Sequence, residues 1–137
     1  SITLTGVVFC FVLAPTFGSN AFNLPNVLTH VIVPLAAVAD FMLCGREYTF
    51  RTADCLYSAL PALYYLGFAS VGYVLNWPFG PGINYPYFFL NWGSPAGAWG
   101  FCDGLPFMGV MYYVLIMLVS IIFVGWLYIR SAQIQKK

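Results

Sequence analysis

The nine charged residues of this 137-residue chain are spaced so unevenly that long uncharged runs dominate it. These runs cover residues 1–39, 55–102 and 104–129. A helix that crosses the hydrocarbon core of a membrane needs about 20 apolar residues, so each run can hold at least one. Only 7% of the residues are charged, whereas a soluble domain has about 25%. The sequence therefore predicts an all-α, polytopic transmembrane helix bundle.

Proline, glycine and polar residues divide the uncharged runs into four predicted membrane segments, at about residues 2–14, 24–43, 54–76 and 105–129. The first is about 20 Å long as a helix, which is too short for a core of about 30 Å. It is interpreted as the end of a truncated span. Because the chain also begins at a serine in hydrophobic sequence, without a recognisable signal peptide, we expect it to be a C-terminal fragment.

The ends and bends of these segments have local signals. Pro15 is expected to end the first segment, and Pro61 is expected to bend the third. Asn23 or Asn26 is expected to cap the second segment, and Gly45 to close it. Residues 77–104 are too rich in glycine and proline for a span, and their Trp and Tyr side chains suit the membrane–water interface. A long aromatic interfacial loop is therefore predicted between the last two spans.

The basic residues predict an orientation. They lie between the second and third predicted spans and after the last one, at Arg46, Arg51, Arg130, Lys136 and Lys137. Two spans separate these places, so they share one side of the membrane. By the positive-inside rule, the 44–53 loop and the C-terminus are predicted to face the cytoplasm.

Several classes of partner have no support in the sequence. The net charge of +1 gives no basic surface for a nucleic acid. The four cysteines lack metal-binding spacing, and the single histidine has no Cys, Asp or Glu cluster beside it. No metal and no cofactor is expected. The predicted partners are membrane lipids and further helices, supplied either by other proteins or by upstream parts of the same protein.

His30, the only histidine, lies inside the first uncharged run. An ionisable side chain at membrane depth is costly and is a functional-site hypothesis by default. Pro34 follows four residues later and has no N–H, so a regular helix would leave the His30 carbonyl without its usual partner. A titratable ring and a freed carbonyl are therefore predicted at one place on one helix.

Polar residues near His30 predict a pocket. Asn23, Asn26 and His30 are spaced by three and four residues, so they share a helix face, with Thr29 beside it. This stripe is expected to face protein or a water-filled cavity rather than lipid. We expect an outward-opening pocket that lipid tails enter from the side. Pro34 is expected to line it, and the aromatic loop to roof it through Tyr85, Tyr87 and Trp92.

Three stretches of the chain resemble a known family: NVLTHVIVPL (26–35), YSALPALYY (57–65) and NYPYFFLNW (84–92). They are similar to the androgen-induced/FAR-type multispan membrane family and its bacterial relatives, in which a histidine precedes a proline in one membrane helix and a Tyr-Pro-(Tyr)-Phe-Leu text follows in a later loop. The resemblance covers most of residues 1–130 and implies the last four of about six spans.

Eukaryotic members of that family hydrolyse fatty-acid esters of hydroxy fatty acids with an intramembrane threonine and histidine. The resemblance implies that His30 is the catalytic base. It places the threonine nucleophile on an earlier helix, outside this chain, because Thr3 and Thr5 do not match its position.

Three functions therefore stay open. The first is a membrane lipid-ester hydrolase with His30 as base. The second is a non-catalytic membrane subunit or scaffold packed against partner helices, and the third is a small-solute or proton carrier that uses His30. For the ring itself, a structural role with a hydrogen bond to an asparagine or a carbonyl is the alternative to a functional one. The environment of His30, either a cavity or a packed interior, discriminates between these roles.

Overall fold

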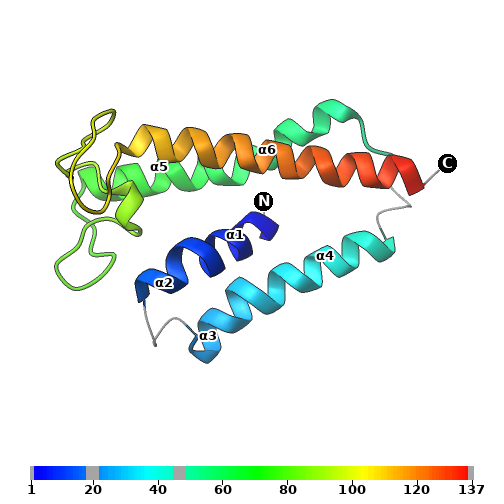
Figure 1. Ribbon diagram of the computed structural model, residues 1–137, viewed down its shortest axis with the longest axis horizontal. Helices are drawn as coiled ribbons and strands as arrows, with labels where there is room; N and C mark the ends of the chain where they lie inside the picture. Colours follow the sequence, from blue (N-terminus) through cyan, green and yellow to red (C-terminus); the bar gives the residue numbers. More distant parts are fainter. Residues whose placement is uncertain (1, 18–21, 45–48, 136–137) are drawn as a thin grey trace. The chain divides into compact units, whose positions relative to one another are not determined.

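The computed structural model describes residues 2–17, 22–44 and 49–135, and most of them are helical (Figure 1). Within these ranges there is no β-strand, only two isolated bridges, Gly80–Ile83 and Phe101–Met108. The predicted helical class is confirmed. The chain divides into two compact units, one made of Ser1–Ser58 with Ile121–Lys137 and the other of Ala59–Ser120.

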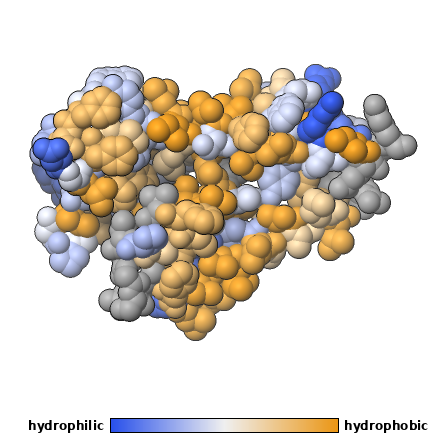
Figure 2. Space-filling model, in the orientation of Figure 1, coloured by the Kyte–Doolittle hydropathy of each residue, from blue (hydrophilic) through white to orange (hydrophobic). Residues whose placement is uncertain are grey.

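Three helical stretches are long and apolar enough to cross a membrane: Leu24–Cys44, Thr52–Val74 and Val110–Ile134. They correspond to the last three predicted spans. The first predicted segment gives only a shorter apolar helix, so the count of four spans is not confirmed. Many large apolar side chains on these helices are exposed, including Leu35 and Leu43 on Leu24–Cys44. Hydrophobic residues cover much of the face seen in Figure 2. These helices therefore suit lipid rather than water.

The N-terminal helix continues past its proline. It consists of α1 (Ile2–Val8), the π-helical turn η1 (Phe9–Leu13) and α2 (Ala14–Phe17). The prediction that it ends at Pro15 is wrong. In η1 the Ala14 N–H donates to the carbonyl of Phe9, five residues earlier. Such a local π adjustment lets an apolar helix tolerate a proline that has no N–H to donate.

The second helix also contains a π-helical turn before a proline. It consists of α3 (Leu24–Val27), the π-helical turn η3 (Leu28–Ile32) and α4 (Val33–Cys44). Asn23 is its N-cap: the side-chain oxygen accepts the Asn26 N–H at 3.0 Å, and a proline occupies the first turn. Of the two predicted N-cap residues, Asn23 is the one that caps the helix. The predicted closing residue, Gly45, lies outside the described residues.

The third helix changes type along its length, from the 3₁₀ helix η5 (Thr52–Ala59) to α5 (Leu60–Val74). The Asp54 carboxylate accepts the backbone N–H of Arg51 at 2.8 Å and so caps the 3₁₀ start. Pro61 lies in the first turn of α5, where a missing N–H breaks no helical bond. The predicted bend inside one helix is therefore replaced by a junction between two helix types.

The last helix, α6 (Val110–Gln135), begins five residues later than predicted. Residues before it pair with each other instead: the Cys102 N–H donates to the Phe107 carbonyl at 3.1 Å, and the Gly109 N–H donates to Gly100 at 2.8 Å. This pairing keeps the segment around Pro106 out of the helix.

Carbonyls of the preceding loop also cap α6. The Val110 N–H donates to Gly97 at 3.1 Å and the Met111 N–H donates to Ala98 at 3.1 Å. These are among the N–H groups that a helix start leaves without a partner. The segment between α5 and α6 is therefore an ordered cap built from backbone, with the short 3₁₀ turn η6 (Phe88–Leu90) inside it.

Tyr128, on α6, ties α1 and α4 together in the unit that contains His30. Its hydroxyl is hydrogen-bonded to that of Thr3 at 2.7 Å, and its ring meets Phe41 edge-on at 4.7 Å. Nearby, the Ser58 hydroxyl donates to the Ile121 carbonyl at 3.2 Å. The two Tyr128 contacts link α1 and the helix that carries His30 through α6.

Alanine substitutions at two glycines test the packing of the loop that caps α6. Gly109→Ala places a methyl group against the backbone of Ala98, because a Cβ at this position would overlap that carbonyl. Overpacking costs about 1–3 kcal/mol, so we expect a lower thermal unfolding midpoint in detergent. Gly67→Ala, in α5, meets nothing within 4 Å and gains helix propensity, so an unchanged or slightly higher midpoint is expected. Equal midpoints for the two variants would contradict the cap.

Candidate functional site

His30 lies in the π-helical turn η3 and stacks on an aromatic ring of the N-terminal helix. The centroids of His30 and Phe9 are 4.6 Å apart and the rings are inclined by 13°. Phe9 is only 1% exposed and also meets Phe22 edge-on at 6.1 Å. The imidazole is therefore fixed in orientation by a buried aromatic partner.

One nitrogen of the His30 ring is unsatisfied. Nδ1 is buried and has no hydrogen-bond partner within the described part of the chain. Buried polar atoms are nearly always bonded, so an orphan of this kind calls for a functional or a strain explanation. The structural role, with a bond to an asparagine or a carbonyl, is not found for Nδ1 among these residues.

Both partners of the stack come from π-helical turns. The turns η1 and η3 contact each other, and each ends two residues before a proline, Pro15 or Pro34. Single π-turns inside α-helices occur frequently at functional sites. Here two such turns contact each other. The backbone geometry therefore singles out the His30 region as a candidate site, without reference to the imidazole.

Gly6, on α1, meets the backbone of His30. A Cβ at Gly6 would lie 3.0 Å from the His30 carbonyl oxygen and 3.1 Å from Cβ of Pro34. Pro34 has no N–H to donate to the His30 carbonyl. This carbonyl lies against α1, which approaches closely because Gly6 has no side chain. Sequence reasoning missed Gly6. Its signal was a small residue inside an apolar helix, which is typical of close helix contacts.

A cavity of about 190 Å³ opens between the N-terminal helix and the helix that carries His30. Its lining is almost wholly apolar and includes Thr3, Gly6, Cys10, His30, Pro34 and Val38. His30 and Pro34 therefore line a common cavity, with walls from α1, η1, η3 and α4. Cys10 brings a thiol to the same cavity, a feature that sequence reasoning did not single out.

The other residues of the predicted polar stripe do not line this cavity. The side chains of Asn23 and Thr29 bond to backbone groups of their own helix. Asn23 is exposed and caps the helix. Thr29 is exposed, and its hydroxyl donates to the Pro25 carbonyl at 2.8 Å. Asn26 is half-buried, and its backbone N–H serves the cap. Shared spacing along the helix thus did not make these side chains part of one pocket.

The predicted loop residues belong to the unit Ala59–Ser120, whereas His30 belongs to the other unit. Tyr85 and Trp92 are half-buried. Tyr87 stacks on Phe89 with centroids 5.1 Å apart and lines a different cavity, between α5 and α6. The predicted roof over His30 stays a prediction.

No model of a known protein family matches this chain, and neither does a curated protein sequence or a solved structure. Within the described ranges, no three His, Cys, Asp or Glu side chains gather where they could hold a metal ion. The His30 cavity and the chemistry of its residues are therefore the basis for inferring a function.

Removal of the stacking ring should expose His30. We expect Phe9→Leu, which keeps an apolar side chain but loses the stack, to speed carbethoxylation of the imidazole by diethyl pyrocarbonate in detergent. Because His30 is the only histidine, the absorbance change reports on this ring alone. Ile2→Ala, on the same helix but away from the cavity lining, should leave the rate unchanged. The same rate in Phe9→Leu and in the unmodified protein would argue against the stack.

Proposed function

We propose that this chain belongs to an integral membrane lipid-ester hydrolase in which His30 acts as the general base. The observation that carries the proposal is the buried Nδ1 of His30, which has no partner among the described residues and lies in a helix long and apolar enough to cross a membrane. A general base needs a ring nitrogen with a free lone pair that a proton donor can reach. A ring that served packing alone would be better replaced by an apolar side chain.

The cavity supports an apolar substrate. Its volume of about 190 Å³ and its apolar walls suit an acyl chain, with the ester group next to the imidazole. Water is scarce in such a site, which favours a substrate that arrives from the lipid phase. The resemblance to the androgen-induced/FAR-type family points to the same class, fatty-acid esters of hydroxy fatty acids.

The proposed reaction needs a nucleophile besides His30. The hydroxyl of Thr3 is bonded to Tyr128, and that of Thr29 donates to a backbone carbonyl. With these two hydroxyls engaged, the proposed nucleophile is water or a residue outside this chain, and the Cys10 thiol in the cavity lining is the alternative. His30 accepts its proton as it attacks the ester carbonyl, and returns the proton to the leaving alkoxide. The net change is ester plus water to acid plus alcohol.

Replacement of the base tests the proposal. General acid–base catalysis contributes about 10²–10⁴-fold to a rate, so His30→Ala should lower hydrolysis of a fatty-acid ester of a hydroxy fatty acid by that order. Turnover is measured by mass spectrometry of the released acid in proteoliposomes. The matched control is Ile32→Ala, on the same turn but exposed and outside the cavity lining. Hydrolysis that survives His30→Ala would remove His30 from the chemistry.

Cys10 lines the same cavity as His30, so the identity of the nucleophile can be separated from that of the base. Cys10→Ala should retain turnover if the nucleophile is water or an external residue. If Cys10→Ala loses turnover while His30→Ala also does, the thiol is the nucleophile and forms a thioester. Thioester formation can be detected as an acyl adduct on Cys10 that hydroxylamine removes.

A non-catalytic membrane subunit is the second candidate function. Only 6% of the membrane-spanning window in Leu24–Cys44 is buried within the structure, which leaves most of this helix free for lipid or for partner helices. A fixed membrane protein that co-purifies with the chain, together with unchanged turnover in His30→Ala, would favour this function.

We further propose that the 44–53 loop and the C-terminus face the cytoplasm, with the α5–α6 loop on the other side. Arg51 and Arg130 are exposed at the described ends of the spans, whereas Arg46, Lys136 and Lys137 lie outside the described residues. In a variant without native cysteines, Thr49→Cys should react with a membrane-impermeant maleimide only from the cytoplasmic side, and Asp103→Cys only from the opposite side. Labelling of both from one side would contradict this orientation.

A further inference from the structure

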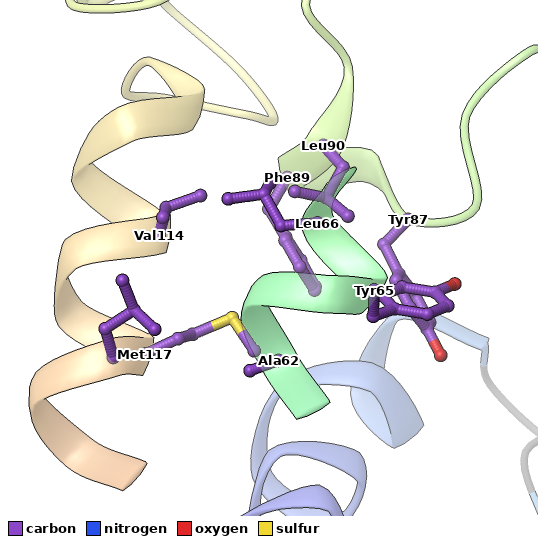
Figure 3. Close-up of a pocket in the computed structure, with 9 residues that line it drawn as sticks. Ala62, Tyr65, Leu66, Tyr87, Phe89, Leu90, Val114 and Met117 are labelled. Carbon is purple, nitrogen blue, oxygen red and sulfur yellow. The ribbon is translucent and has the colours of Figure 1, made fainter. Parts of the chain in front are cut away.

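A second cavity lies inside the unit Ala59–Ser120. It has a volume of about 90 Å³ and is lined by side chains of α5, of α6 and of the loop between them. In Figure 3, Val114 and Met117 on α6 lie across from Leu66 and Ala62 on α5, and the loop contributes Phe89 to the lining. A water molecule needs about 10–15 Å³ of such space, so this cavity is much larger than an ordinary packing defect.

The wall contributed by the loop is held in place. Phe89 and Leu90 are 5% and 6% exposed, and the Leu90 N–H donates to the Tyr87 carbonyl at 2.9 Å. Tyr87 stacks on Phe89 with the two rings only 6° from parallel, and Phe89 also meets Tyr113 at 5.9 Å. Because these aromatic rings fix one another, the wall cannot collapse inwards to fill the space.

The cavity suits an apolar occupant from the bilayer. Almost no polar atom lines it, and water does not stay where it lacks two or more polar partners. Val114 and Leu118, four and eight residues after the start of α6, lie about 6–12 Å along the helix. Both belong to the span Val110–Ile134, and the α5 lining belongs to Thr52–Val74. The neighbouring medium is therefore hydrocarbon.

The near absence of charged side chains in this unit favours one class of lipid as the occupant of the cavity. Residues 59–120 contain one charged side chain, Asp103, and no Lys, Arg or His. The carboxylate of a free fatty acid would find no cation there, and an unpaired charge in the membrane is costly. A phospholipid keeps its charged headgroup in the interface and inserts only its chain. We propose that this cavity binds part of one acyl chain of a bilayer phospholipid.

The hydroxyl groups of Tyr65 and Tyr87 point away from Val114 and Met117 in Figure 3, so the two tyrosines present their rings to the cavity and leave its lining apolar. The site does not depend on His30, which lies in the other unit, so its failure and that of the hydrolase proposal can be told apart.

The test uses the full chain in phosphatidylcholine vesicles with a trace of phosphatidylcholine that carries a diazirine in one acyl chain. After illumination, mass spectrometry maps the label. We expect label on the Leu66 and Phe89 peptides above the level on lipid-exposed segments. Met117→Trp fills the cavity and should lower that label severalfold. Ile116→Trp, on the preceding residue, which is 55% exposed and outside the lining, should leave the label unchanged. Ala62→Leu is a milder filling variant if Met117→Trp does not fold.

Three results would overturn the proposal. The first is equal labelling of these peptides in folded Met117→Trp or Ala62→Leu and in the unmodified protein. The second is label spread evenly over the lipid-exposed surface. The third is stronger cavity labelling by a diazirine fatty acid than by the phosphatidylcholine, which would replace the phospholipid by a free acid. Labelling in His30→Ala should equal that of the unmodified protein, whatever happens to ester turnover.

Discussion

A polypeptide that crosses hydrocarbon must satisfy its backbone N–H and C=O groups within itself, because lipid offers no hydrogen bonds. This constraint explains most of the local structure. Pro15 and Pro34 each follow a π-helical turn that rearranges the bonding before the proline. At the start of α6, loop carbonyls accept the free N–H groups. The long-range arrangement at His30 results from these local solutions, because the two π-turns that precede the prolines bring Phe9 and His30 into contact.

Around His30, the cost of a polar ring in an apolar helix is reduced only in part. Stacking on Phe9 buries one face of the ring, and Gly6 allows the His30 carbonyl to lie against a neighbouring helix. Nδ1 gains nothing from either contact. A buried acceptor or donor without a partner costs about 1–3 kcal/mol, which packing alone does not recover. The proposed proton transfer uses this same nitrogen, and therefore explains why a side chain with this energetic cost stands here.

Hydropathy and charge spacing predicted three helices that the structure contains, because apolar length is a property of each segment by itself. The cap at Asn23 was also predictable, since it depends on residues three positions apart. The Phe9–His30 stack was not, because it joins residues on different helices. Two residues of the predicted polar stripe, Asn23 and Thr29, have local roles: their side chains bond to nearby backbone in the first turns of the helix, as Asn and Thr often do.

The two cavities differ in one chemical respect. The cavity at His30 has an ionisable ring and a thiol among otherwise apolar walls, whereas the cavity between α5 and α6 has almost no polar atom. Apolar walls alone bind a chain but cannot move a proton. His30 adds a titratable ring to its cavity, and electrostatic interactions are stronger in apolar surroundings than in water. Chemistry is therefore expected at the first cavity and lipid binding at the second, which makes the two functions separable by substitution.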